Sequence, residues 1–151
     1  MATKTMDAGH DYVQPRSAYS GITYIKSDYT AAGSTLSSGD VFWACKIPNQ
    51  ATIVDLRFWG RASGVGGVVF NVGTTDSASL FGPATISATH QYISLTAGAS
   101  ATAQLPYRVS LSDDTATQFV RLALTVASGT ATATGSFGLL VGYLMPGTAG
   151  P

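Results

Sequence analysis

The sequence predicts an all-β protein: an antiparallel β-sandwich, for which a jelly roll is one candidate topology, preceded by an extended N-terminal arm. Apolar and polar residues alternate along several segments, as they do in half-buried strands. Clusters of Gly, Ser and Thr separate these segments and favour turns. No helical period is sustained, so the crossover helices of a parallel sheet are missing. We expect one sandwich domain over residues 18–146, an arm over 1–17 and a tail over 147–151.

The N-terminal arm has two interpretations. It holds little to bury beyond Tyr12 and Val13, and a frayed terminus is the commoner fate of such a segment. However, Tyr12 and Tyr19 lose free energy if their rings stay in water. The alternative is an arm that becomes ordered against a neighbouring subunit, which makes Tyr12 and Tyr19 candidate interface residues.

Two strands are expected before the centre of the chain. Residues 19–29 are rich in β-branched and aromatic residues, which favour strands. Residues 41–47 alternate, and strict alternation places one apolar set on the same side of the strand: Val41, Trp43, Cys45 and Ile47. Pro48 and Asn49 then break the strand.

The central stretch, residues 53–75, is expected to be the ribbon on which later strands pack. In its first strand one side is apolar and predicted to face the core: Val54, Leu56 and Phe58. The glycine-rich residues 63–67 are predicted to form a hairpin tip. After that turn a second apolar set repeats the core face: Val68, Phe70 and Val72.

The later part of the chain continues the pattern. A loop carries Leu80 and Phe81, which we expect to tuck under one end of the sandwich. Alternation predicts further strands near residues 105–111, 118–126 and 137–145. In the last strand Gly138 and Gly142 lie opposite the apolar face, which indicates a close approach by another part of the chain.

Composition excludes several classes of partner. Eight basic and eight acidic residues give zero net charge, and only 11% of residues are charged, against about a quarter in typical domains. The chain has no basic stripe for nucleic acid or for an anionic membrane. A surface of Ser, Thr, Ala and Gly loses little when desolvated, so we expect much of it to be covered in an assembly.

The residue inventory predicts no enzyme and no catalytic, metal or cofactor site. The histidines, His10 and His90, are predicted to lie in surface segments. Cys45 is the only cysteine, which rules out an internal disulfide, and its strand position predicts a buried, inert thiol. Asp113 and Asp114 are adjacent, so they point apart in extended chain and are expected to cap a turn. With no signal peptide and no apolar run of membrane-spanning length, we expect synthesis and folding in a cytoplasm.

One cluster on the central ribbon is a candidate interface. Arg57, Trp59 and Arg61 share the side opposite the predicted core face. Trp and Arg are typical hot spots of protein interfaces. Two other interpretations stay open: Trp59 packs beneath another part of the chain, or it stacks on a sugar.

Two segments resemble a pattern in small virion proteins of tailed bacteriophages. IPNQATIVDLRFWG, residues 47–60, leads from a proline-containing turn into a strand, and VVFNVGTTDSASLF, from Val68, ends a strand in an NVGTTD turn. The late segment QFVRLALTVASGTATATGSFGLLVGYLMP is also similar to theirs. The resemblance covers residues 41–146 and omits the arm.

The resemblance implies a capsid decoration or cement protein, with tail and head-fibre components as neighbours in class. Such proteins commonly form trimers over gaps between capsomers, so it implies the major capsid protein and further copies of the chain as partners. It implies a place on the capsid surface of the virion after synthesis in the host cytoplasm. It transfers no catalytic residue. The alternative from the residues alone is a carbohydrate-binding module that uses Trp59, with Tyr92 or Tyr107 as further stacking platforms.

Overall fold

The structure is a computed structural model, and within its described residues every regular element is a β-strand. It describes residues 3–5, 21–30, 33–61, 68–85, 91–95, 105–109, 119–129, 131–133 and 135–145. The strands are β1 (Thr3–Thr5), β2 (Thr23–Lys26), β3 (Tyr29–Thr30), β4 (Ser34–Leu36), β5 (Val41–Pro48), β6 (Thr52–Arg61), β7 (Val69–Thr74), β8 (Pro83–Thr85), β9 (Gln91–Ser94), β10 (Tyr107–Arg108), β11 (Phe119–Ser128), β12 (Ala131–Ala133) and β13 (Ser136–Leu144).

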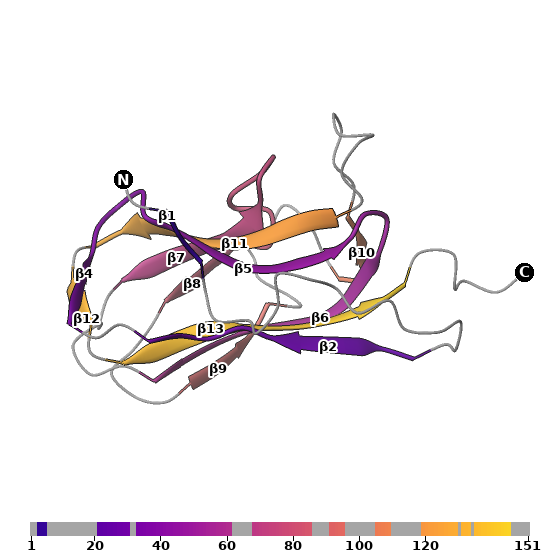
Figure 1. Ribbon diagram of the computed structural model, residues 1–151, viewed down its shortest axis with the longest axis horizontal. Helices are drawn as coiled ribbons and strands as arrows, with labels where there is room; N and C mark the ends of the chain where they lie inside the picture. The colour runs from indigo at the N-terminus through magenta and orange to yellow at the C-terminus, as the bar shows by residue number, and fades with distance from the viewer. Residues whose placement is uncertain are drawn as a thin grey trace, which may run out of the picture.

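Two main sheets face each other as the layers of a β-sandwich (Figure 1). The first, here called the β5–β11 sheet, has the order β1-β5-β11-β7-β8. The second, the β6–β13 sheet, has the order β10-β6-β13-β2, with β9 also on β6 and β3 also on β13. Strands β4 and β12 form a separate ribbon. The all-β sandwich prediction is confirmed, while the jelly-roll topology stays a prediction.

An aromatic cluster fills the space between the sheets. The Phe70 ring lies 4.9 Å from Phe137, 5.7 Å from Phe58 and 6.2 Å from Phe42, measured between centroids. These four rings are at most 1% exposed, and they come from β7, β13, β6 and β5. Edge-on and tilted pairs at such distances add stability beyond the area they bury. The two sheets are therefore held face to face by rings from both layers.

The predicted hairpin across residues 63–67 is wrong. β6 pairs with β13, β9 and β10, whereas β7 pairs with β11 and β8, so the two strands lie in different sheets. Phe58 and Phe70 still face the core from opposite layers. Alternation predicts which side of a strand is apolar, but it does not distinguish edge-to-edge pairing from face-to-face packing.

Two β-bulges correct the predicted side-chain directions. In β5, Leu122 of β11 pairs with Cys45 while Ala123 pairs with Trp43, so Ala44 is the extra residue. The bulge lets Phe42 and Cys45 both face the core and turns Trp43 outward, which makes the predicted Trp43–Cys45 face wrong.

The second bulge lies in β6. Asp55 pairs with Gly142 and Ile53 with Tyr143, so Val54 is the extra residue. Ile53 is fully buried and Val54 only half-buried, so Ile53 occupies the core position predicted for Val54.

The late strands follow the prediction. In β11 the core side is fully buried, at no more than 1% exposure, and consists of Val120, Leu122, Leu124 and Val126. In β13 the core side is equally buried and consists of Phe137, Leu139, Val141 and Tyr143. The loop after β7 buries Phe81 and packs Leu80 against the core, as expected.

The chain begins with a short strand on a sheet edge. β1 pairs in parallel with the start of β5, whereas every other strand pair among the described residues is antiparallel. The rest of the predicted arm lies outside the described residues. In the described part of the chain no helix is long and apolar enough to span a membrane.

Candidate interaction surfaces

The three residues of the predicted cluster on β6 differ in how they are placed. The Arg57 side chain is 49% exposed, and its Nε donates a hydrogen bond of 3.1 Å to Oδ1 of Asp55. Trp59 is only 6% exposed, although it does not belong to the core cluster between the sheets. Arg61 ends β6, and its side chain lies outside the described part of the structure.

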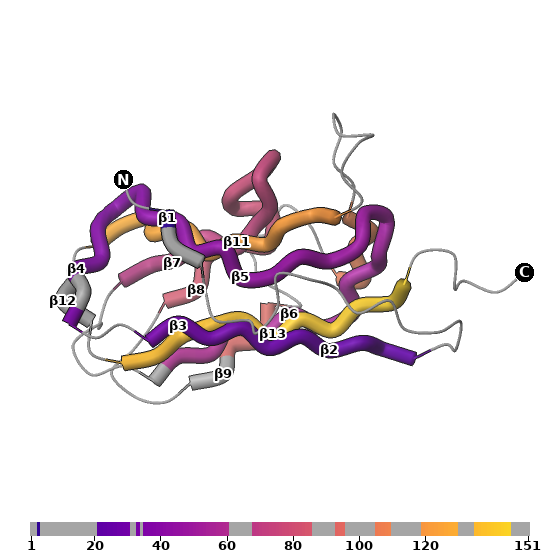
Figure 2. Tube along the Cα trace, viewed as in Figure 1, coloured from indigo at the N-terminus to yellow at the C-terminus, as the bar shows by residue number. Residues whose placement is uncertain are grey.

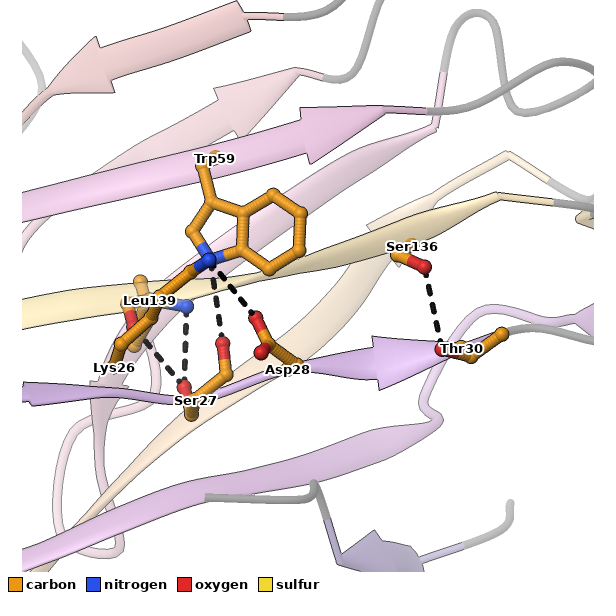
Figure 3. Close-up of polar contacts among 7 residues, drawn as sticks. All are labelled: Lys26, Ser27, Asp28, Thr30, Trp59, Ser136 and Leu139. Atoms are coloured by element: carbon orange, nitrogen blue, oxygen red, sulfur yellow. Dashed lines mark hydrogen bonds and ion pairs between the residues drawn. The ribbon is translucent and has the colours of Figure 1, made fainter. Parts of the chain in front are cut away.

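Trp59 is held by an unusual arrangement at the β2–β13 edge (Figure 3). The Leu139 N–H donates to Oγ of Ser27 at 3.1 Å, so a side chain occupies a position that a strand carbonyl would normally take. The Ser27 carbonyl is thereby free to accept a hydrogen bond from the Trp59 indole Nε1 at 3.2 Å. The indole thus links the central strand β6 to the end of the outermost strand β2.

A glycine makes this arrangement possible. A Cβ built on Gly138 would overlap the carbonyl oxygen of Ser27 and lie 2.8 Å from Nε1 of Trp59. Gly142 lies four residues further along β13 on the same face. A Cβ built on Gly142 would lie 2.7 Å from the Tyr24 ring, which covers this glycine. The close approach predicted from these two glycines is confirmed.

Exposed polar and aromatic groups surround the buried indole. Lys26 Nζ lies 4.6 Å from the centroid of the Trp59 ring and 3.7 Å from Oδ1 of Asp28. Tyr24 is 52% exposed above Gly142. We call this outer face of the β6–β13 sheet the Tyr24 patch; its members are Tyr24, Lys26, Asp28 and Arg57. It carries both signs of charge around an exposed aromatic ring, so it is suited to a polar protein interface.

The outer face of the other sheet carries a second cluster. The Arg121 guanidinium lies 5.5 Å from the centroid of the Trp43 ring, a cation–π distance. Lys46 pairs directly with Arg121 in the ladder, and Phe119, two residues from Arg121, is 39% exposed. We call this cluster the Trp43 patch; its members are Trp43, Lys46, Phe119 and Arg121. Trp and Arg side chains are typical of the residues that dominate interface energies, so this cluster is a second candidate interface.

Sequence reasoning missed the Trp43 patch because it placed Trp43 on the same side of the strand as the buried Cys45. The bulge at Ala44 reverses the strand face at that point, and Arg121 lies far away in the sequence. Only the register between β5 and β11 would have predicted the Trp43 patch. The alternation pattern of one strand does not contain that register.

The other predicted site residues mostly fall outside the described residues. Tyr12 and Tyr19 do so entirely, as does the side chain of Tyr92. Tyr107 is half-buried and packs edge-on against Phe81, with ring centroids 5.5 Å apart. The interface role of Tyr12, Tyr19, Arg57, Trp59 and Arg61 stays a prediction.

The one cysteine lies in the core. Cys45 is buried, and burial raises the pKa of its thiol to about 12. The thiol therefore stays protonated at neutral pH and is a poor nucleophile. His10, His90, Asp113 and Asp114 lie outside the described residues. Among the residues that the structure does describe, no three His, Cys, Asp or Glu side chains gather as a metal site would require.

Comparison with known proteins finds likeness in structure alone. No protein-family model matches the sequence, and no curated protein matches it. The fold is similar to a chain of the structure titled "Capsid of Ralstonia phage GP4", with a TM-score of 0.69, 18% identity, and coverage of 95% of this chain and 98% of that one. It is also similar to a chain of the "Cyanophage Pam1 capsid asymmetric unit", with a TM-score of 0.51, 19% identity, and coverage of 93% and 96%. At these identities the likeness establishes the fold.

Proposed function

We propose that this chain is a structural, non-enzymatic protein of a bacteriophage particle, and that it decorates and cements the assembled capsid. The observation that carries the proposal is the end-to-end likeness to a chain of the Ralstonia phage GP4 capsid structure. Both chains are covered almost completely, so the likeness extends over the whole domain and is not confined to one hairpin. The second likeness, to a chain of a cyanophage capsid structure, supports the same kind of particle.

The surface chemistry supports a bridging role. The Tyr24 patch and the Trp43 patch lie on the outer faces of opposite sheets, so each can contact a different neighbour. Each patch combines an aromatic ring with an Arg, the residue types that dominate interface energies. Several weak contacts of this kind add up when one molecule spans two capsid subunits. The partner in this proposal is the major capsid protein, and the location is the outer capsid surface of the virion.

Self-association completes the proposal. A homotrimer over the gap between capsomers would place three copies of each patch against the shell, which multiplies weak affinities. The low charge of the chain, 11% of residues, reduces the desolvation that burial between copies requires. Light scattering on the purified protein tests this directly: a trimer mass supports it, and a stable monomer at micromolar concentration contradicts it.

The decisive experiment measures particle stability. Particles assembled without this protein should release their DNA at lower temperature, or on milder osmotic shock, than complete particles. Adding the purified protein back should restore the resistance. Equal robustness with and without the protein would refute the cement role.

Point variants locate the capsid-binding face. Arg121→Ala should weaken binding to protein-free particles by about tenfold, equivalent to about 1.4 kcal/mol. Thr35→Ala, at an exposed position of the β4–β12 ribbon away from both patches, is the matched control. If both variants bind equally well, the Trp43 patch does not face the capsid, and Arg57→Ala then tests the Tyr24 patch.

Two alternatives are separated by other measurements. A tail or head-fibre component would locate to those parts of the particle when the protein is labelled for electron microscopy. A carbohydrate-binding module would require a free stacking face, and Trp59 has already used its N–H and buried its ring within the chain. A glycan array is the direct test of that function, and a specific signal there would support it.

A further inference from the structure

The first strand of the chain is attached in an unusual way. β1 pairs only with β5 in the described structure, and it contributes backbone pairing over three positions: Thr3 with Val41, Lys4 with Phe42 and Thr5 with Trp43. Thr3 is the one residue of β1 whose side chain is described, and it is exposed. The contact is therefore strand addition to a sheet edge, in which the backbone hydrogen bonds can be supplied by a strand of the same chain or of another chain.

The position of β1 does not require it to come from the same molecule. β1 lies toward the left end of the upper sheet in Figure 1, whereas β2 begins at the right end of the lower sheet in Figures 1 and 2. Fifteen residues, 6–20, separate β1 from Gly21, the next residue that the structure describes. Fifteen residues can reach about 50 Å when extended, more than the diameter of about 40 Å expected for a domain of this length. The same connection can therefore deliver β1 to an adjacent copy.

We propose that in the assembled oligomer the edge of β5 is occupied by β1 of a neighbouring copy. The inference rests on the proposed self-association and is independent of capsid binding. Donor strand and acceptor edge are different surfaces, so the contact is head-to-tail and closes into a ring when the rotation between copies allows it. A trimer in which each copy lends β1 to the next is such a ring. The exchange gives the N-terminal arm its partner: a second copy of this chain.

The register provides a direct chemical test. Thr3 and Val41 are paired residues on neighbouring strands, where Cα atoms lie about 5 Å apart, within the range of about 4.4–6.8 Å that a disulfide needs. Thr3→Cys and Val41→Cys would be combined in a Cys45→Ala background, which removes the natural thiol. Thr125 pairs with Val41 from the other side, so a Thr3→Cys/Thr125→Cys pair is two strands apart and serves as the matched negative control.

Oxidation of the purified oligomer followed by non-reducing gel electrophoresis reads the result. The exchange predicts covalent dimers and trimers for the Thr3→Cys/Val41→Cys protein and single chains for the control. Reduction should convert the covalent dimers and trimers back to single chains. A mixture refolded from the two single variants should also form covalent dimers. Intrachain links alone, detected as a faster-running single chain, would overturn the exchange, and so would the absence of any link.

Light scattering before oxidation separates the two proposals. An oligomer that yields only intrachain links refutes strand exchange and leaves self-association standing. A monomer refutes the self-association and the exchange together. An oligomer that yields the interchain ladder supports both.

Discussion

The glycines of β13 allow a matched test of how Trp59 is held. A methyl group at position 138 would overlap the Ser27 carbonyl, which is backbone, whereas one at position 142 would meet the ring of Tyr24, the far end of a half-exposed side chain. Both glycines lie in the same strand and on the same face. We therefore expect Gly138→Ala to destabilise the protein strongly and Gly142→Ala to do so weakly.

The magnitude follows from the contacts that must shift. Turning the Ser27 carbonyl away leaves the buried Trp59 N–H without its acceptor, at about 1–3 kcal/mol, and disturbs two Ser27–Leu139 hydrogen bonds at about 1 kcal/mol each. Replacing glycine by alanine in a strand returns about 0.5–1 kcal/mol. The net loss for Gly138→Ala is about 3 kcal/mol, a fall in Tm of about 6–12 °C. For Gly142→Ala we expect less than about 1 kcal/mol, because a surface ring moves at little cost.

Urea denaturation followed by tryptophan fluorescence measures both variants. A double-mutant cycle with Trp59→Phe then isolates the hydrogen bond, because Gly138→Ala should cost about 1–3 kcal/mol less once the indole N–H is absent. Equal midpoints for the two alanine variants, or strict additivity in the cycle, would refute the described role of the Ser27 carbonyl.

Two further predictions concern the core. Phe70→Ala should lower the free energy of unfolding by about 3–5 kcal/mol in urea titrations, since its ring contacts three others, while Phe119→Ala at the surface should cost less than about 1 kcal/mol. Burial raises the pKa of the Cys45 thiol from 9.0 to about 12. Burial, and to a smaller extent the charge interaction with Cys45, raises the pKa of Tyr143 from 10.0 to about 12. The folded state then holds protons that the unfolded state releases, so stability should fall as pH rises from about 9 to 12. Cys45→Ala should flatten that fall, and a thiol reagent at pH 8 should react only after unfolding; rapid reaction of the native protein would contradict a buried thiol.

The sequence was sufficient for the fold class and for the apolar faces of β11 and β13. In both strands strict alternation matches burial along the whole apolar face, because the pleat fixes the side and the one extra residue within β11, Ala127, follows its last apolar core position, Val126. In β5 and β6 the same rule failed on one side of a bulge, at Ala44 and at Val54. A bulge is a property of two paired strands, and neither strand alone carries its signature.

The two tryptophans show why the candidate surfaces were harder to predict than the fold. Alternation placed Trp59 on the outer face correctly, yet its exposure depends on Ser27 and Gly138, which reach it from two other strands. Alternation placed Trp43 on the same side of its strand as the buried Cys45, but the bulge turns Trp43 outward, where it meets Arg121.

The side of a strand is a local property, while the availability of a side chain to a partner depends on neighbours brought together by strand pairing. A single sequence therefore predicts that a sandwich has an apolar inside, but the rings that remain outside and accessible are determined by the register. In this protein the register brings the half-buried, outward-facing Trp43 to Arg121 on the β5–β11 sheet, whereas Trp59 on β6 is buried. The Trp43 patch is thus the surface on which variants should first be tested for capsid binding.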